Sequence, residues 1–285
     1  MAEEVSPEKA KEIVEMLTGG GSIESINTSL ALGILPLVES IGDNDLLHRL
    51  VEHAQQVAED DIEKGWARFE HLKRYAGSID DVAELAFHAE SLEKGAPLAA
   101  AVLHHHALML LSIAEIDSAQ TSIRRSLTLR ESIEDQEGIV YGLAVLSRCS
   151  RLNQDWDSAI IHDTRRLELA ISMQNDVLRM EALADVAHAQ ASIGELATAS
   201  EMYQESLDFA KRLEHPAGHL VASWGIADLA EIETRYDDAL LALSDTMHLF
   251  MQLGIPAPDL LKKRLHDLTI PVSYTHLRAH ETCPY

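Results

Sequence analysis

Cysteine is nearly absent from the sequence, and no long hydrophobic run is present. The two cysteines, Cys149 and Cys283, are too few for a disulfide framework of the kind that staples small secreted domains. The first residues, MAEEVSPEKAKEIVEML, are acidic and lack the apolar core of a signal peptide. The most apolar run, residues 30–38, is too short to cross a bilayer. We therefore expect a soluble, cytoplasmic protein.

Positive charge is also scarce. The chain has 23 Lys and Arg residues against 47 Asp and Glu residues, which gives a formal net charge of −24 at pH 7. A surface of this charge repels the phosphate backbone of nucleic acids. The composition therefore argues against a general role in DNA or RNA binding and indicates a well-solvated acidic surface.

Motifs of catalysis are missing as well. The sequence has no glycine-rich phosphate loop, no nucleophile elbow and no HExxH pair. The run His104-His105-His106 invites a metal-site interpretation. Adjacent residues on a helix point about 100° apart, so three in a row do not converge on one ion. We predict that the protein is not an enzyme and holds no cofactor and no metal.

What the sequence does contain is a long internal repeat. Its clearest column is a ladder of four evenly spaced alanines, Ala119, Ala159, Ala199 and Ala239. Bulky residues keep the same register three positions before and eight positions after each alanine: Ile116, Trp156, Leu196 and Tyr236, then Leu127, Leu167, Leu207 and Met247. The period is about 40 residues, within the range of roughly 20 to 50 residues that indicates a repeat array.

The repeat predicts one helical hairpin per period. Small residues let two helix axes approach, and large apolar residues fill the space beside them. A single hairpin cannot bury its apolar face, so neighbouring hairpins must stack. We expect Asp117, Asp157 and Asp237 to be N-caps of second helices. No alternating strand pattern is visible, which favours an all-α fold.

These columns resemble the tetratricopeptide repeat family, which places one large and two small side chains at fixed helix positions near an aromatic residue. Two successive repeats supply Leu143, Ser147, Ala159 and Trp156, then Leu183, Ala187, Ala199 and Leu196. The usual period of the family is shorter, about 34 residues. Its helix-ending proline is replaced here by Glu131, Ile171, Lys211 and Met251. The resemblance covers roughly residues 22–254 and implies a right-handed superhelical solenoid of antiparallel helix pairs.

We expect five segments along the chain. They are an N-terminal helix (1–21), two degenerate hairpins (22–96), four regular repeats (97–254), a further helix (255–270) and a tail (271–285). Within the tail, residues 272–282, VSYTHLRAHET, resemble a translated sequencing adapter. We therefore expect the natural protein to continue differently after Ile270, and we assign no function to Cys283.

In the tetratricopeptide family the first helix of each hairpin lines a concave groove, and the resemblance implies such a groove here. The matching positions are Lys64, Arg68, Arg74, Tyr75, His104, Leu108, Tyr141, Arg148, Arg151, Glu181, Asp185, His188, Trp224 and Asp228. Basic residues come first and acidic residues later, so we predict a polarised groove for an extended or helical peptide whose acidic part faces the N-terminal repeats. Tyr75, Tyr141 and Trp224 would be aromatic anchors. The alternative is that these are ordinary solvated positions.

Two functions follow from this interpretation. The first is a non-enzymatic scaffold that binds a protein or peptide partner in the groove. The second is the sensor or regulatory module of a larger bacterial signalling or transcription regulator whose effector domain lies beyond Ile270. Neither implies nucleic acid or membrane as a partner, and the ends of a solenoid also allow self-association.

Overall fold

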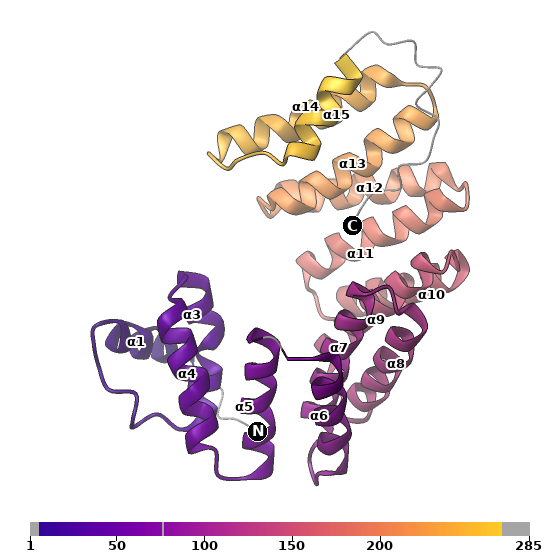
Figure 1. Cartoon of the computed structure of the whole chain (residues 1–285). Helices are drawn as coiled ribbons and strands as arrows, with labels where there is room; N and C mark the ends of the chain where they lie inside the picture. Colours follow the sequence, from indigo (N-terminus) through magenta and orange to yellow (C-terminus); the bar gives the residue numbers. More distant parts are fainter. Residues whose placement is uncertain (1–5, 76, 270–285) are drawn as a thin grey trace. The chain divides into compact units, whose positions relative to one another are not determined.

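The computed structural model describes residues 6–75 and 77–269, which form helices joined by short loops (Figure 1). No strand occurs in these two ranges, so the predicted all-α class is confirmed. The adapter-like segment and Cys283 lie outside the described residues.

The chain divides into two compact units, Met1–Asn153 and Gln154–Tyr285, each with hydrophobic clusters of its own. The helices of unit 1 are α1 (Pro7–Thr18), α2 (Thr28–Gly33), α3 (Leu35–Ile41), α4 (Asn44–Val57), α5 (Asp61–Arg74), α6 (Ile79–Ser91), α7 (Ala96–Ser112), α8 (Ile116–Ser132) and α9 (Gln136–Leu152). The helices of unit 2 are α10 (Trp156–Ser172), α11 (Asp176–Ser192), α12 (Leu196–Arg212), α13 (Pro216–Ile232), α14 (Tyr236–Gln252) and α15 (Asp259–Thr269).

Successive helices pack against one another within each unit. In unit 1 this holds from α2 to α9, and in unit 2 from α10 to α15 (Figure 1). The predicted pairing of consecutive helices is therefore confirmed. From α7 to α14 every helix has 17 residues. These helices start at even intervals, at positions 96, 116, 136, 156, 176, 196, 216 and 236. The backbone thus repeats with every helix, whereas the side chains repeat with every second helix.

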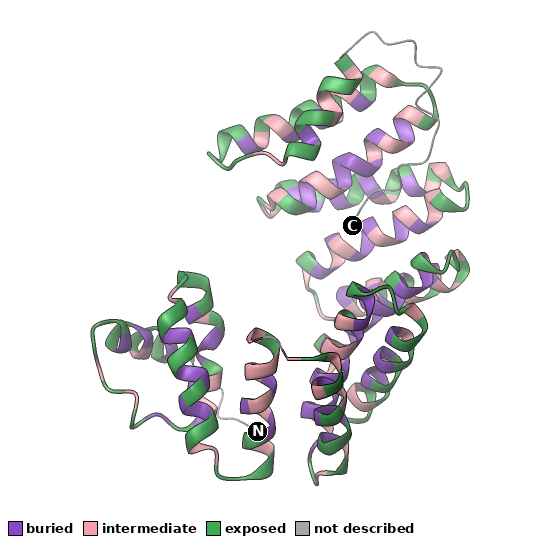
Figure 2. Cartoon of the chain, viewed as in Figure 1, coloured by how far each residue is buried: buried purple, intermediate pink, exposed green. Residues whose placement is uncertain are grey.

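The alanine ladder is buried as the sequence predicts, because all four alanines are fully buried. Buried residues recur along the helices of both units, where exposed residues alternate with them (Figure 2). The predicted N-caps are wrong, however. Asp117, Asp157 and Asp237 lie in the first helical turn, and the N-caps stand two positions earlier, at Glu115, Asp155 and Arg235. In the first turn the carboxylates still stabilise their helices, since they face the positive end of the helix dipole.

The ends of the N-terminal helices lie at serine, proline and glycine residues that favour helix starts or stops. Ser6 is the N-cap of α1 and its Oγ accepts a hydrogen bond from the Lys9 backbone N–H at 3.3 Å. Pro36 lies in the first turn of α3, and the preceding helix α2 ends before Ile34, because proline cannot continue a helix in which its missing N–H is needed. Gly42 ends α3 in the left-handed conformation, with φ of 74°.

The loops after α7 to α14 share one conformation. Each has a residue with positive φ two positions after the helix: Ala114, Glu134, Gln154, Gln174, Gly194, Glu214, Thr234 and Gly254. At Gly194 the backbone N–H donates to Ala191 O at 3.1 Å, and at Ala114 the N–H donates to Leu111 O at the same distance. Glycine takes this conformation without steric cost, whereas a side chain with Cβ does not. Six of the eight loops therefore hold a residue that is less suited to the position than glycine.

Ala114→Gly should raise the free energy of unfolding by about 0.5 kcal/mol, and Gly194→Ala should lower it by about 1 kcal/mol. The two changes are opposite at equivalent positions, with φ of 61° and 91°. A Cβ added at Gly194 would meet nothing within 4 Å, so the effect comes from the backbone alone. Urea unfolding of both variants measures it, and equal signs for the two changes would contradict the argument.

Candidate peptide-binding surface

The predicted groove residues lie on the odd-numbered helices, apart from Tyr75, which is the C-cap of α5. Odd-numbered helices also contact one another within each unit. In unit 1, α7 contacts both α5 and α9, and in unit 2, α11 contacts α13. We name two sets of residues by their place in the chain. The N-terminal face is Lys64, Arg68, Arg74, Tyr75, His104, Leu108, Tyr141, Arg148 and Arg151. The C-terminal face is Glu181, Asp185, His188, Trp224 and Asp228.

The three cations on α5 all have acidic partners. Lys64 lies 3.8 Å from Asp61, and Arg68 lies 3.5 Å from Glu84 on α6. Both pairs are exposed, so each contributes little to stability, about 0–1 kcal/mol, and either cation could exchange its partner for a ligand. Arg74 differs, because its side chain is largely buried and pairs with Glu70 and, at 3.1 Å, with Glu39 on α3. Arg74 therefore ties α5 to α3 and is the least accessible of the three.

Tyr75 packs against histidines. Its ring lies edge-on to His48 of α4, with centroids 5.0 Å apart, and is tilted against His71 at 5.4 Å. Burial raises the pKa of Tyr75. These contacts place Tyr75 at the junction of α4 and α5 with part of its ring still open to solvent.

The three adjacent histidines of α7 have different surroundings. His105 lies edge-on to Phe69, with centroids 5.7 Å apart, and His106 Nδ1 lies 3.0 Å from Ser122 Oγ. Burial, reinforced by the positive charge of Arg130, lowers the pKa of His104 to about 4. Across residues 6–75 and 77–269 no group of three or more His, Cys, Asp or Glu side chains is placed to hold a metal.

Leu108 and Tyr141 bring apolar surface to the N-terminal face. Leu108 of α7 is 39% exposed and Tyr141 of α9 is 46% exposed. Helix α7 has no Asp, Glu, Lys or Arg. On α9 the exposed Arg148 lies two turns beyond Tyr141, and the buried residues of this helix are mostly apolar. Arg151 is half-buried, and its Nη1 donates to Ser147 Oγ at 3.2 Å. Exposed apolar groups and cations therefore occur on helices that contact one another, α5, α7 and α9.

On the C-terminal face the acidic residues of α11 are paired with an arginine that the sequence analysis did not single out. Arg166 of α10 donates through Nη2 to Glu181 Oε2 at 2.7 Å and through Nη1 to Asp185 Oδ2 at 2.5 Å. Its side chain is only 4% exposed. His188, one turn further along α11, lies edge-on to Trp156 with centroids 6.0 Å apart.

A second arginine pairs with the acidic residues of α13. Arg264 of α15 donates to Asp228 Oδ1 at 2.5 Å and to Glu231 Oε1 at 2.6 Å, and its Cζ lies 4.4 Å from the centre of the Trp224 ring. Burial raises the pKa of Asp228 even with the guanidinium beside it. Trp224 is 9% exposed, so in this arrangement Arg264 covers the aromatic anchor that the sequence predicts.

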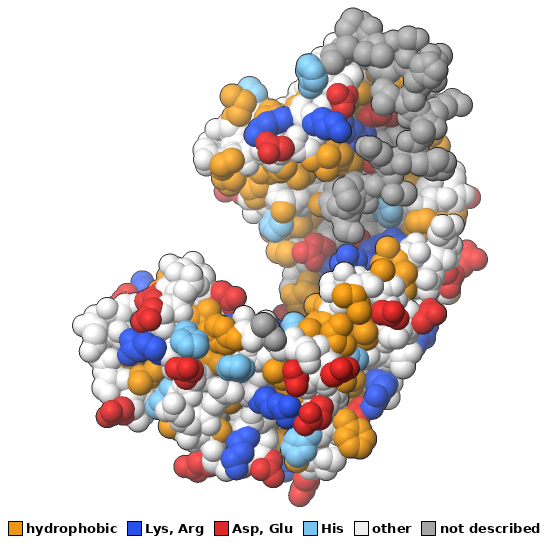
Figure 3. Space-filling model, in the orientation of Figure 1, with side chains coloured by type: hydrophobic (Ala, Val, Ile, Leu, Met, Phe, Trp, Pro, Cys, Tyr) orange, Lys and Arg blue, Asp and Glu red, His pale blue; other side chains and the backbone are white. Residues whose placement is uncertain are grey.

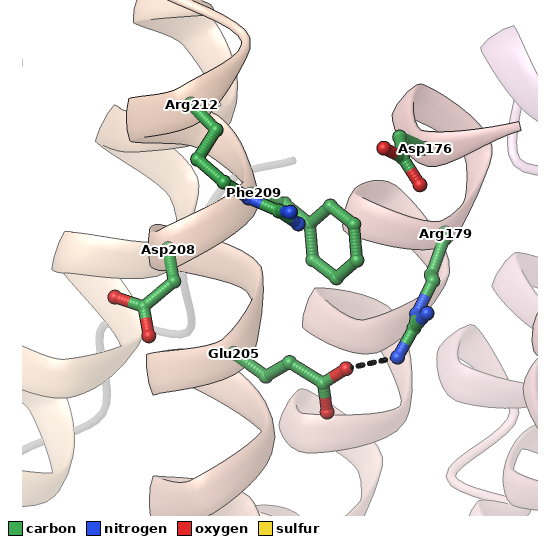
Figure 4. Close-up of a pocket in the computed structure, with 6 residues that line it drawn as sticks. All are labelled: Asp176, Arg179, Glu205, Asp208, Phe209 and Arg212. Atoms are coloured by element: carbon green, nitrogen blue, oxygen red, sulfur yellow. Dashed lines mark hydrogen bonds and ion pairs between the residues drawn. The ribbon is translucent and has the colours of Figure 1, made fainter.

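A surface pocket between α11 and α12 lies outside both predicted faces (Figure 4). The Phe209 ring lies between two guanidinium groups, that of Arg179 at 4.7 Å and that of Arg212 at 4.3 Å. Arg179 also pairs with Glu205 at 2.5 Å, and Asp176 and Asp208 complete the lining. The pocket has three carboxylates and two guanidinium groups, so its charges largely balance.

No protein-family profile and no curated protein sequence matches the chain, but solved structures resemble it. A signal transduction ATPase with numerous domains and a tetratricopeptide repeat sensor, from Pyrococcus horikoshii, is 15% identical with a TM-score of 0.60; the match covers 93% of this chain and 43% of that one. A Rap protein complexed with Competence and Sporulation Factor is 17% identical with a TM-score of 0.60, over 92% and 79% of the two chains. Aspartyl phosphate phosphatase F from Bacillus subtilis is 12% identical with a TM-score of 0.58, over 95% and 76%.

At these identities the likeness establishes the fold alone. The chain has a tetratricopeptide-like helical repeat fold, and it spans less than half the length of the ATPase it resembles. Proteins with this fold include a sensor-bearing ATPase, a factor-binding protein and a phosphatase, so the function must be argued from the side chains of this chain.

Proposed function

We propose that the chain is a non-enzymatic scaffold that binds a protein or peptide segment on its N-terminal face. The observation that carries the proposal is the exposure of Leu108 and Tyr141 on the neighbouring helices α7 and α9. Arg68 lies on α5, which also contacts α7, and Arg148 lies on α9. Apolar groups reach the surface among scattered charges elsewhere too (Figure 3). What distinguishes this face is a helix, α7, without a single carboxylate in a chain of net charge −24.

The chemistry of the face selects its partner. Leu108 and Tyr141 offer apolar contact, and Arg68 and Arg148 favour carboxylates. The partner is therefore a segment with apolar side chains and acidic flanks. A solved structure of similar fold, a Rap protein, is complexed with Competence and Sporulation Factor, which supports a binding role for a chain of this fold.

A display selection of random peptides against the full chain tests the proposal. We expect enrichment of peptides with acidic residues next to Leu, Phe or Tyr. The double variant Arg68→Glu/Arg148→Glu should bind the selected peptides about tenfold more weakly, since two favourable charge contacts become repulsive. A matched control is Arg235→Glu/Lys262→Glu, which changes the net charge equally at two exposed cations outside the N-terminal face.

The control variant should bind as the wild type does. Equal losses in both double variants would show a general charge effect and would refute a specific N-terminal face. Peptides that bind both variants unchanged would refute it as well.

The second candidate function is the sensor or regulatory module of a larger bacterial regulator. It is favoured by the likeness to an ATPase that carries a tetratricopeptide repeat sensor, of which this chain spans 43%. Sequencing the 3′ end of the gene from its source DNA tests it. An effector domain after Ile270 would support the module, and further repeats or an early stop would support the free-standing scaffold. No helix in the described part of the chain has the length and hydropathy to span a membrane, and a cytoplasmic location stays a prediction.

A further inference from the structure

The guanidinium group of Arg264 occupies a site formed by Trp224, Asp228 and Glu231, which we call the arginine pocket. Arg264 Nη2 donates to Asp228 Oδ1 at 2.5 Å and to Glu231 Oε1 at 2.6 Å, and Nε donates to the same Glu231 oxygen at 3.2 Å. The guanidinium carbon lies 4.4 Å from the centre of the Trp224 ring. Charge, hydrogen bonds and an aromatic face thus all act on one planar group.

This combination selects arginine over lysine. A guanidinium group is planar, so it can stack on an indole while its edge donates to two carboxylates. An ammonium group is compact and more strongly hydrated, so it loses more water on entering and cannot donate in the same plane. Burial opposes the charge of Arg264, but the two carboxylates outweigh it and raise the pKa of Arg264. The pocket therefore holds a charged guanidinium group.

The residue that fills the pocket comes from the least embedded helix of unit 2. Helix α15 has 11 residues, against 17 for α11 and α13, and Leu261 is its one buried residue among those described. Helix α15 begins at residue 259, outside the even spacing of helix starts that runs from residue 96 to residue 236. Its arginine is therefore not a requirement of the repeat.

The two carboxylates of the pocket are also partly open to solvent. The side chains of Asp228 and Glu231 are 45% and 34% exposed, although that of Arg264 is only 14% exposed. The carboxylates that pair with Arg166, Glu181 and Asp185, are exposed to a similar degree, 42% and 32%, but Arg166 itself is more enclosed, with 4% exposure. A guanidinium group from outside can therefore reach the carboxylates at the arginine pocket.

We propose that the arginine pocket binds an arginine side chain of a partner segment, which takes the place of Arg264. This rests on the proposed function, in which a protein or peptide is bound on the N-terminal face, and it adds a separate, cation-binding contact on α13. Arg264 then acts as an internal occupant that lowers the affinity for arginine until a partner displaces it.

The test uses the full chain and a small probe, N-acetyl-L-arginine methylamide, with the lysine analogue as the matched control. The probes are titrated into wild type, Arg264→Ala, Arg264→Ala/Asp228→Asn and Lys262→Ala, and the indole NMR signal of Trp224 reports binding at the pocket. We expect Arg264→Ala to bind the arginine probe at least about tenfold more tightly than wild type and than it binds the lysine probe. The added Asp228→Asn change should abolish the gain.

Lys262→Ala controls for changes in α15 itself, because Lys262 lies on the same helix and pairs only with Asp259 among the described residues. It should bind as wild type does. If Arg264→Ala fails to fold, Arg264→Lys replaces it, and should gain affinity for the arginine probe by a smaller factor. Equal affinities for arginine and lysine, or no gain on vacating the pocket, would overturn the inference. Neither result would bear on the peptides selected for the N-terminal face, and failure of that selection would leave the arginine result standing.

Discussion

Replacing Arg166 by methionine should lower the free energy of unfolding by about 2 kcal/mol, since a buried guanidinium group is lost and two partly buried carboxylates are left without it. The side chain of Arg166 is 4% exposed and donates to both Glu181 and Asp185 on α11. Methionine fills much of the same volume, so the loss reports the ion pairs more than a cavity. Urea unfolding measures the total, and amide exchange in α10 and α11 locates it.

Arg235→Met is the matched control for Arg166→Met. Arg235 also pairs with two carboxylates, Glu233 and Asp238, but its side chain is half exposed. The expected loss is therefore about 0–1 kcal/mol. Adding Glu181→Gln and Asp185→Asn to Arg166→Met should recover part of its loss, because no unpaired charge remains. Equal losses for Arg166→Met and Arg235→Met would contradict the assignment of Arg166 as a buried clamp.

The fold was predictable because its determinants are local and repeated. Ala119 and its three counterparts are all fully buried, and each column of the repeat gives the same evidence again. Helix ends were less predictable, as Asp117 shows. An acidic residue is favoured both at the N-cap and in the first turn, so its presence fixes the helix start only to within about two residues.

The one-helix period of the backbone could not be predicted from the sequence, for a related reason. First and second helices have equal lengths and equal loops, but they bury different side chains, so only the two-helix period is written in residue types. Ala114 and Gly194 adopt the same left-handed conformation, yet only the glycine signals it in the sequence.

The candidate site was predictable only in part. Family positions pointed to Glu181 and Asp228, but not to the arginines that pair with them. Arg166 lies 15 residues from Glu181, and Arg264 lies 36 residues from Asp228. The packing of the helices decides which cation pairs with which carboxylate, and the repeat period of the sequence does not specify these pairs. The sequence therefore indicated an acidic end of a groove, whereas the structure has two guanidinium-filled sites.

The stability of the protein should fall by about 2 to 3 kcal/mol between pH 7.5 and pH 4.5 through His104 alone. Burial, then the charges of Arg130 and His105, lower the pKa of His104 from 6.5 to about 4 in the folded chain. The unfolded chain therefore binds a proton at higher pH than the folded chain does. Stability from this residue is complete above pH 6.5 and is lost as the pH falls from 6.5 toward 4.

His104→Leu removes the titrating group and suits the apolar surroundings, where His104 Nδ1 has no hydrogen-bond partner among the described residues. The variant should lose less stability than wild type over the same pH range, by about 2 to 3 kcal/mol. His88→Leu changes an exposed histidine of α6 and should follow the wild type at both pH values. Carboxylates throughout the chain also titrate in this range, so the difference between the two variants isolates His104. Parallel losses in His104→Leu and His88→Leu would mean that His104 is charged in the folded protein and that α7 does not bury it.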